Sequence, residues 1–106
     1  MRRLIEEAAG VLNVGSTGRE ILVLLSRSRR GLSVREIIEK TKRSERAIKA
    51  HLKHLHEMGL LKRMDFWTRN RRRAHKYSLP APAEFLISVR REVHRQLKRL
   101  EEFVEG

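Results

Sequence analysis

Two helix-start signals, eleven residues apart, constrain the fold of this 106-residue chain more than any other feature of the sequence. Ser33 is followed three residues later by Glu36, which is the pattern of a capping box. In such a box the hydroxyl and the carboxylate accept hydrogen bonds from backbone N–H groups that the helix leaves without partners. Ser44 is also a favourable N-cap residue. The sequence therefore predicts two helices in close succession, the first of them short and ending near Thr41.

The second helix, expected over residues 45 to 58 and closed by Gly59, is apolar on one side and basic on the other. At about 100° per residue, one narrow sector holds Ile48, Leu52 and Leu55. The opposite face holds Arg46, Lys49, Ala50, Lys53 and Glu57. Two helices joined by a tight connection, the second with these two faces, are typical of a helix-turn-helix. Its second helix fits the major groove of DNA, which is about 12 Å wide.

Two further helices are expected before this pair. Apolar residues at helical spacing predict one helix over residues 2 to 12. Thr17 and Glu20 fit another capping box, so we expect the next helix from about 18 to 29, ahead of Gly31.

A basic hairpin is predicted after the helix pair. Residues 60 to 66 and 73 to 79 have the composition of strands, and the polar residues 68 to 72 connect them. Guanidinium groups at such a tip can reach phosphates or enter a neighbouring minor groove. Here they belong to Arg69, Arg71, Arg72 and Arg73. Phe66 and Trp67 precede the tip; core packing is the commoner fate of such a pair, and stacking on single-stranded bases is the alternative.

The positive charge is concentrated in this part of the chain. The formal net charge is +12, and residues 42 to 76 hold twelve Lys and Arg against three acidic residues. The other 71 residues account for only +3. A solvated helical protein would spread both signs along its faces, so this concentration predicts a binding surface for a polyanion, with nucleic acid as the first candidate. An ordinary solvated basic face is the alternative.

Residues 17 to 79 resemble the winged helix-turn-helix domains of the ArsR-like and MarR-like transcription regulators, and single-domain archaeal regulators are similar in size and layout. The segments that carry the resemblance are Leu32 to Ile38, Ser44 to Leu55, Gly59 to Arg63 and Arg72 to Leu79. The resemblance implies homodimeric, sequence-selective DNA binding and control of transcription. The fold class that we expect is mainly α with a small β-hairpin. It is a winged helix-turn-helix with an N-terminal helix and a long C-terminal dimerisation helix.

The last helix is expected over residues 83 to 105, after Pro80-Ala81-Pro82. Its apolar stripe continues farther than the small domain can cover, so we expect it to contact the same helix of a second chain. The predicted contacts are Leu86, Val89, Val93, Gln96, Leu97, Leu100, Phe103 and Val104. Folding back on the first helices of its own chain is the alternative. Residues 1 to 79 would then form the DNA-binding domain and residues 83 to 105 the dimerisation helix.

The expected partner is double-stranded DNA, bound by a homodimer. The predicted DNA contacts are Lys42, Ser44, Arg46, Lys49, Ala50, Lys53, His54, Arg69, Arg71, Arg72 and Arg73. The second helix would face the major groove, the residues before it would meet the backbone, and the hairpin would hold the flanking groove. Two other functions stay open. One is a chromatin-type architectural binder with little sequence preference, and the other is a winged helix that contacts an acidic protein.

Other chemistry finds little support. The chain has no cysteine, and the spacing of His51, His54 and His56 does not suit a metal site on a helix. Neither a nucleophile with its base nor a glycine-rich phosphate loop is visible. We therefore expect no enzyme, catalytic residue, metal, cofactor or small-molecule ligand. Without an apolar run long enough to span a bilayer or a secretion signal, we expect a cytoplasmic, nucleoid-associated protein with no membrane partner.

Overall fold

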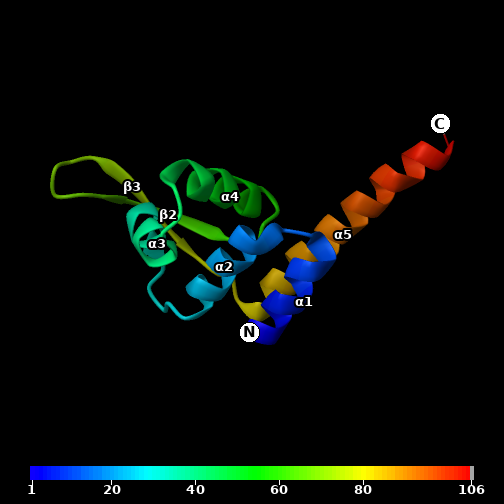
Figure 1. Ribbon diagram of the computed structural model, residues 1–106, viewed down its shortest axis with the longest axis horizontal. Helices are drawn as coiled ribbons and strands as arrows, with labels where there is room; N and C mark the ends of the chain where they lie inside the picture. Colours follow the sequence, from blue (N-terminus) through cyan, green and yellow to red (C-terminus); the bar gives the residue numbers. More distant parts are fainter. Residues whose placement is uncertain (106) are drawn as a thin grey trace.

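Five helices and three short strands make up residues 1–105, the part of the chain that this computed structural model describes (Figure 1). In chain order they are α1 (Arg2–Leu12), α2 (Gly15–Ser26), β1 (Leu32–Ser33), α3 (Val34–Thr41), α4 (Glu45–Glu57), β2 (Lys62–Trp67), β3 (Arg73–Ser78) and α5 (Pro82–Glu105). The strands form an antiparallel sheet in the order β1-β3-β2. The predicted fold class is confirmed, including the N-terminal helix, the hairpin and the long last helix.

The two serine caps start α3 and α4 where the sequence predicts them. Ser33 Oγ accepts a hydrogen bond from the Glu36 N–H at 3.2 Å, and the Ser33 N–H donates to Glu36 Oε1 at 3.1 Å. Ser44 Oγ accepts from the Ala47 N–H at 3.1 Å. Each cap satisfies backbone donors that the first helical turn leaves free.

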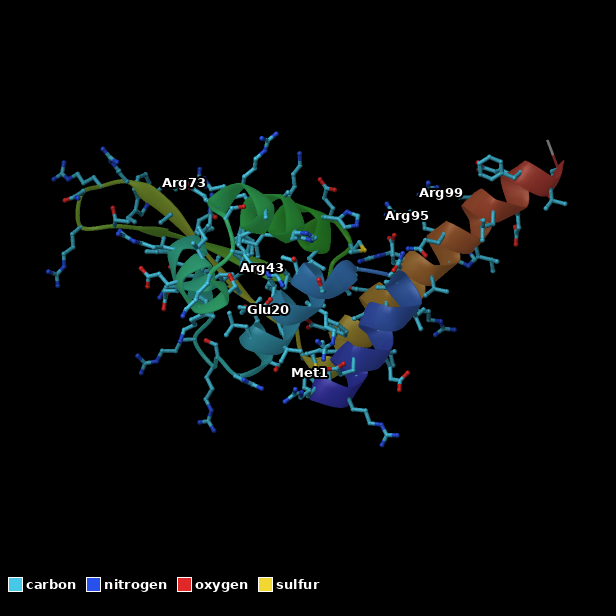
Figure 2. All side chains as sticks on the ribbon, viewed as in Figure 1. Met1, Glu20, Arg43, Arg73, Arg95 and Arg99 are labelled. Atoms are coloured by element: carbon cyan, nitrogen blue, oxygen red, sulfur yellow. The ribbon has the colours of Figure 1, made fainter. Side chains whose placement is uncertain are left out.

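The connection between α3 and α4 is short and is held to α2. Lys42 ends α3 in the left-handed region, at φ 56°, and its N–H donates to the Ile38 carbonyl at 2.8 Å. Arg43 Nε donates to the carboxylate of Glu20 on α2 at 2.8 Å, and Figure 2 shows the two side chains together. The start of α4 is thus fixed relative to the helix beneath it.

The start of α2 differs from the prediction of a helix over 18 to 29. α2 begins three residues earlier, at Gly15, with Val14 as N-cap and no side-chain cap. Thr17 and Glu20 therefore lie inside the helix and form no capping box. The physical reason is that Val14 is buried, so the chain turns into the core directly after α1 and the next helix starts there. The helix also ends three residues before its predicted end.

The sheet contains a strand that the sequence did not predict. β1 pairs with β3, with Leu32 opposite Tyr77, and two residues are too few to give a strand pattern. β2 starts two residues later than expected because Leu60 and Leu61 are buried in the core before the strand begins. We call residues 62–78, which comprise β2, β3 and their turn, the wing.

The hydrophobic core extends from α1 into α5. Its most completely buried side chains include Ile5, Ile21, Leu22, Ile48, Leu52 and Phe85. Since Phe85 lies on α5, the first part of this helix shares one core with residues 1 to 79. The second half of α5 projects away from the rest of the molecule, at the end opposite the wing (Figure 1). None of the helices in residues 1–105 has the length and apolar composition needed to cross a bilayer.

The exit of α4 lies tightly against α5. Gly59 follows α4 with φ +76°, a conformation that favours glycine. A Cβ added there would lie 2.7 Å from Ser88 Oγ and 2.7 Å from Arg91 Nη2. This position therefore needs glycine for both its backbone angle and its space.

Candidate nucleic-acid interface

The outer face of α4 is open to solvent, as predicted. Ile48, Leu52 and Leu55 are buried, which fixes the rotation of the helix about its axis. The other side of the helix and its N-terminal approach expose the predicted contacts Lys42, Ser44, Arg46, Lys49, Ala50, Lys53 and His54. No other part of residues 1–105 covers this face, so a ligand as wide as a duplex can reach it.

The tip of the wing is a tight turn that presents arginines. The Arg71 N–H donates to the Thr68 carbonyl at 3.0 Å, and the Thr68 N–H donates to the Arg72 carbonyl at 2.9 Å. The Arg72 N–H also donates to Thr68 Oγ1 at 3.1 Å. Arg71 has φ 56°, in the left-handed region that is unfavourable for residues other than glycine. The side chains of Arg69, Arg71 and Arg72 are all exposed.

The wing and α4 border the same hollow. Glu45 and Lys49 of α4 line it together with Ala74 and His75 of β3 and residues of α3. Figure 2 places Arg73 where the wing passes the first turns of α4. The basic outer face of α4 and the wing therefore occupy neighbouring surfaces at one end of the molecule.

Ion pairs within the chain divide the twelve Lys and Arg of residues 42–76 into two groups. Five of the twelve have acidic partners: Arg43 with Glu20, Lys49 with Glu45, Lys62 with Glu84, and both Arg63 and Arg73 with Asp65. The other seven form no ion pair within residues 1–105: Lys42, Arg46, Lys53, Arg69, Arg71, Arg72 and Lys76. Six of these seven are predicted DNA contacts, whereas the predicted contacts Lys49 and Arg73 are held by carboxylates.

Asp65 is the centre of a polar network that sequence reasoning missed. Its Oδ1 is 2.6 Å from His75 Nδ1, and its Oδ2 accepts a hydrogen bond from Arg73 Nη2 at 2.9 Å. Arg63 Nε lies 3.7 Å from the same carboxylate. The hydrogen bond with His75 is the main reason why the pKa of Asp65 is lowered; partial burial opposes this effect and Arg73 supports it. The signal was present in the sequence, because a period of two puts Arg63 and Asp65 on one face of β2.

Trp67 is 73% exposed, so core packing, the fate expected for the Phe66–Trp67 pair, is wrong for this residue. The reason is that the wing extends beyond the helices at this point, so no helix of residues 1–105 covers the Trp67 side chain. Phe66 points to the other face of β2 and is partly buried, with Lys76 Nζ 5.3 Å from the centre of its ring.

The predicted dimer contacts on α5 differ in their exposure. Exposed ones are Leu86, Val93, Leu97, Leu100, Phe103 and Val104. Val89 instead lies in the core of its own chain, 8% exposed, which corrects its placement among the dimer contacts. The helical period puts Val89 on the same side as the buried Phe85, four residues earlier. Gln96 is partly buried, and its Nε2 donates to Glu92 Oε1 at 3.3 Å.

These features define a winged helix-turn-helix protein: α3 and α4 are the helix pair, β2 and β3 the wing. The resemblance to ArsR-like regulators is confirmed over residues 15–63. A family model described as "Bacterial regulatory protein, arsR family" matches residues 15–63, from α2 into the start of β2. No curated protein matches the sequence significantly.

Solved structures of three other proteins share the fold. A possible transcriptional regulator from Methanosarcina mazei Go1 is 14% identical, with a TM-score of 0.72, over 95% of this chain and 86% of that one. A protein of the thermoacidophilic archaeon Sulfolobus tokodaii is 20% identical, with a TM-score of 0.64, over 93% and 92%. The S. aureus MepR–DNA complex contains a chain that is 14% identical, with a TM-score of 0.59, over 99% and 84%. At these identities the likeness shows the fold.

Proposed function

We propose that this protein is a DNA-binding transcription regulator that binds a duplex as a homodimer. In this proposal α4 enters the major groove and the wing holds the flanking groove. The distribution of cations carries the proposal. Of the seven basic residues between positions 42 and 76 that form no ion pair within residues 1–105, six lie on α4, just before it, or at the wing tip. The matched regulator family and the structure of MepR bound to DNA support the same function.

In this proposal some of the predicted residues contact base edges and others contact phosphates. Arg46, Ala50 and Lys53 face the base edges, and the small side chain of Ala50 lets the backbone of α4 come close. Lys49 joins them by leaving Glu45, since an exposed ion pair at i, i+4 is weak and is screened by solvent.

The approach to α4 meets the phosphates. The N–H groups of a helix N-terminus favour anions, and Lys42 adds a charge there. Ser44 Oγ accepts from Ala47, which leaves the hydroxyl proton free for a phosphate oxygen. His54 flanks the basic face, and Arg69, Arg71 and Arg72 reach the flanking groove. Arg73 lies beside them, oriented by Asp65.

Selection of binding sites from random duplexes, followed by affinity measurements on selected and unselected sequences, tests the proposal. Arg46→Ala should weaken the selected site by about 1–3 kcal/mol and spare unselected DNA. Arg30→Ala is the matched control, because Arg30 is an exposed arginine on the loop between α2 and β1. Equal affinity for all duplexes would favour an architectural binder instead. Failure of micromolar protein to bind any duplex at low salt would reject DNA binding.

The dimer is proposed from the second half of α5. Exposed apolar residues continue along this half, which no other part of residues 1–105 covers, and their burial against a second copy would remove them from water. Two-fold symmetry would then place two copies of α4 on half-sites one helical turn apart, about 34 Å, or a multiple of it.

Sedimentation analysis tests this part separately. Leu100→Glu should convert a dimer into a folded monomer. Lys98→Gln changes the net charge by the same amount on the opposite side of the helix, and should leave the dimer intact. A monomeric native protein at tens of micromolar would contradict the proposed dimer.

A further inference from the structure

We propose that Trp67 is an apolar DNA contact, whose indole packs against deoxyribose and base edges in the groove that the wing enters. This inference rests on the proposed function and adds to it a contact that carries no charge. It concerns a residue outside the predicted set of DNA contacts, which contains only polar side chains and Ala50.

The fold gives Trp67 no structural task. Its side chain is 73% exposed, although it shares one face of the wing with Tyr77, which is buried at the other end of that face. The register of the hairpin places Trp67 opposite Arg73, at the last pair before the turn. A large aromatic ring left in water at such a position stabilises nothing in the isolated chain, and exposed apolar surface of this kind marks a binding site.

The charges around Trp67 select a polyanion as the occupant. Residues 66 to 83 contain no Asp or Glu, and Arg69, Arg71 and Arg72 follow Trp67 directly. The nearest carboxylate in the sequence, Asp65, is already bound by His75 and Arg73. A ligand with phosphates and apolar surface side by side, as in a nucleic acid, suits both the ring and its cationic neighbours.

A duplex fits this description better than a single strand because of what lies next to the wing. His75 of β3 and Lys49 of α4 line one hollow, so a ligand that occupies the wing continues onto the outer face of α4. That face is exposed along α4, and the major groove of a duplex admits an α-helix. In the adjacent minor groove, apolar side chains pack against sugars and between base steps while neighbouring cations hold the phosphates.

Trp67 is the only tryptophan of the chain, so its fluorescence reports directly on the proposed contact. Addition of duplex DNA should shift the emission to shorter wavelength and reduce quenching by acrylamide. Trp67→Ala should weaken duplex binding about tenfold, as expected when part of an indole loses its burial. The dependence of affinity on salt should not change, since no charge is removed. Trp67→Phe should retain most of the affinity.

Met64→Ala is the matched control, because Met64 is 58% exposed on the opposite face of β2 and should be dispensable. Unfolding in urea checks that each variant folds. If the native protein binds duplex DNA while Trp67→Ala binds equally well and acrylamide quenching stays unchanged, the inference is overturned and the proposed function stands. If the native protein binds no duplex, both fail. Preference for a single-stranded oligonucleotide with strong Trp67 quenching would overturn the groove contact in favour of base stacking.

Discussion

Replacing Arg71 with glycine should make the free protein more stable and its complex with DNA weaker. Arg71 has φ 56°, which costs a residue with a Cβ about 1–2 kcal/mol. Glycine removes this strain but gives the unfolded chain more freedom, at about 0.5–1 kcal/mol. The turn itself is held by backbone groups and by Thr68 Oγ1, which the substitution keeps. The net effect should be a gain of about 0.5–1 kcal/mol in the free energy of unfolding.

Urea denaturation and a salt series of binding measurements separate the two effects. The urea midpoint should rise without a change in the m-value. The slope of log affinity against log salt should fall by about 0.9 if the guanidinium meets one phosphate. Arg71→Asn removes the same charge while tolerating the left-handed region, so it should reproduce the loss of affinity. A lower free energy of unfolding for Arg71→Gly would refute the strain argument, and an unchanged salt slope would remove Arg71 from the interface.

Three further substitutions test the fold that supports this surface. Ser33→Ala should lower the free energy of unfolding by about 1 kcal/mol, measured in urea, because the capping box is lost. Gly59→Ala should cost about 2 kcal/mol or more, since the new Cβ would meet Ser88 Oγ at 2.7 Å; shortening Ser88 to alanine should recover part of the loss. Because the pKa of Asp65 is lower in the folded protein than in the unfolded chain, its ionised carboxylate stabilises the fold. This stabilisation is fully present above the pKa of the unfolded state, about 3.9, and is lost as the pH falls through the pKa of the folded state. The NMR signals of His75 and acid titration of Asp65→Asn check this, and an identical acid transition in the variant would contradict it.

The pair α3 and α4 was predictable because its determinants are local. Ser33 and Ser44 act on the turn that follows them, and the apolar spacing of α4 alone sets which side faces solvent. The same kind of reasoning failed at α2, where Thr17 has the residue type of a cap but Val14 is buried and starts the helix earlier. A tertiary contact overrode a local signal there.

The wing shows where sequence reasoning stops. The four arginines at its tip were visible as charge, but the division between Arg73, held by Asp65, and the arginines without a partner within residues 1–105 depends on the register of β2 and β3. The exposure of Trp67 depends on how far the hairpin extends past the helices, which composition does not encode. On α5, a heptad pattern could not distinguish Val89, which faces its own core, from residues such as Leu100, which face solvent.

α5 is one uninterrupted helix that starts in the core at Phe85 and ends in the exposed apolar residues. In the proposed dimer this helix connects the core of each chain rigidly to the dimer contacts. The angle and the distance between the two copies of α4 therefore depend on how far and in which direction the contact residues lie from Phe85 along the helix. One extra residue between Glu92 and Leu97 would turn the far half by about 100° and advance it by about 1.5 Å. Such an insertion would keep every DNA contact of each chain, but the dimer would prefer DNA sites whose two half-sites are spaced differently.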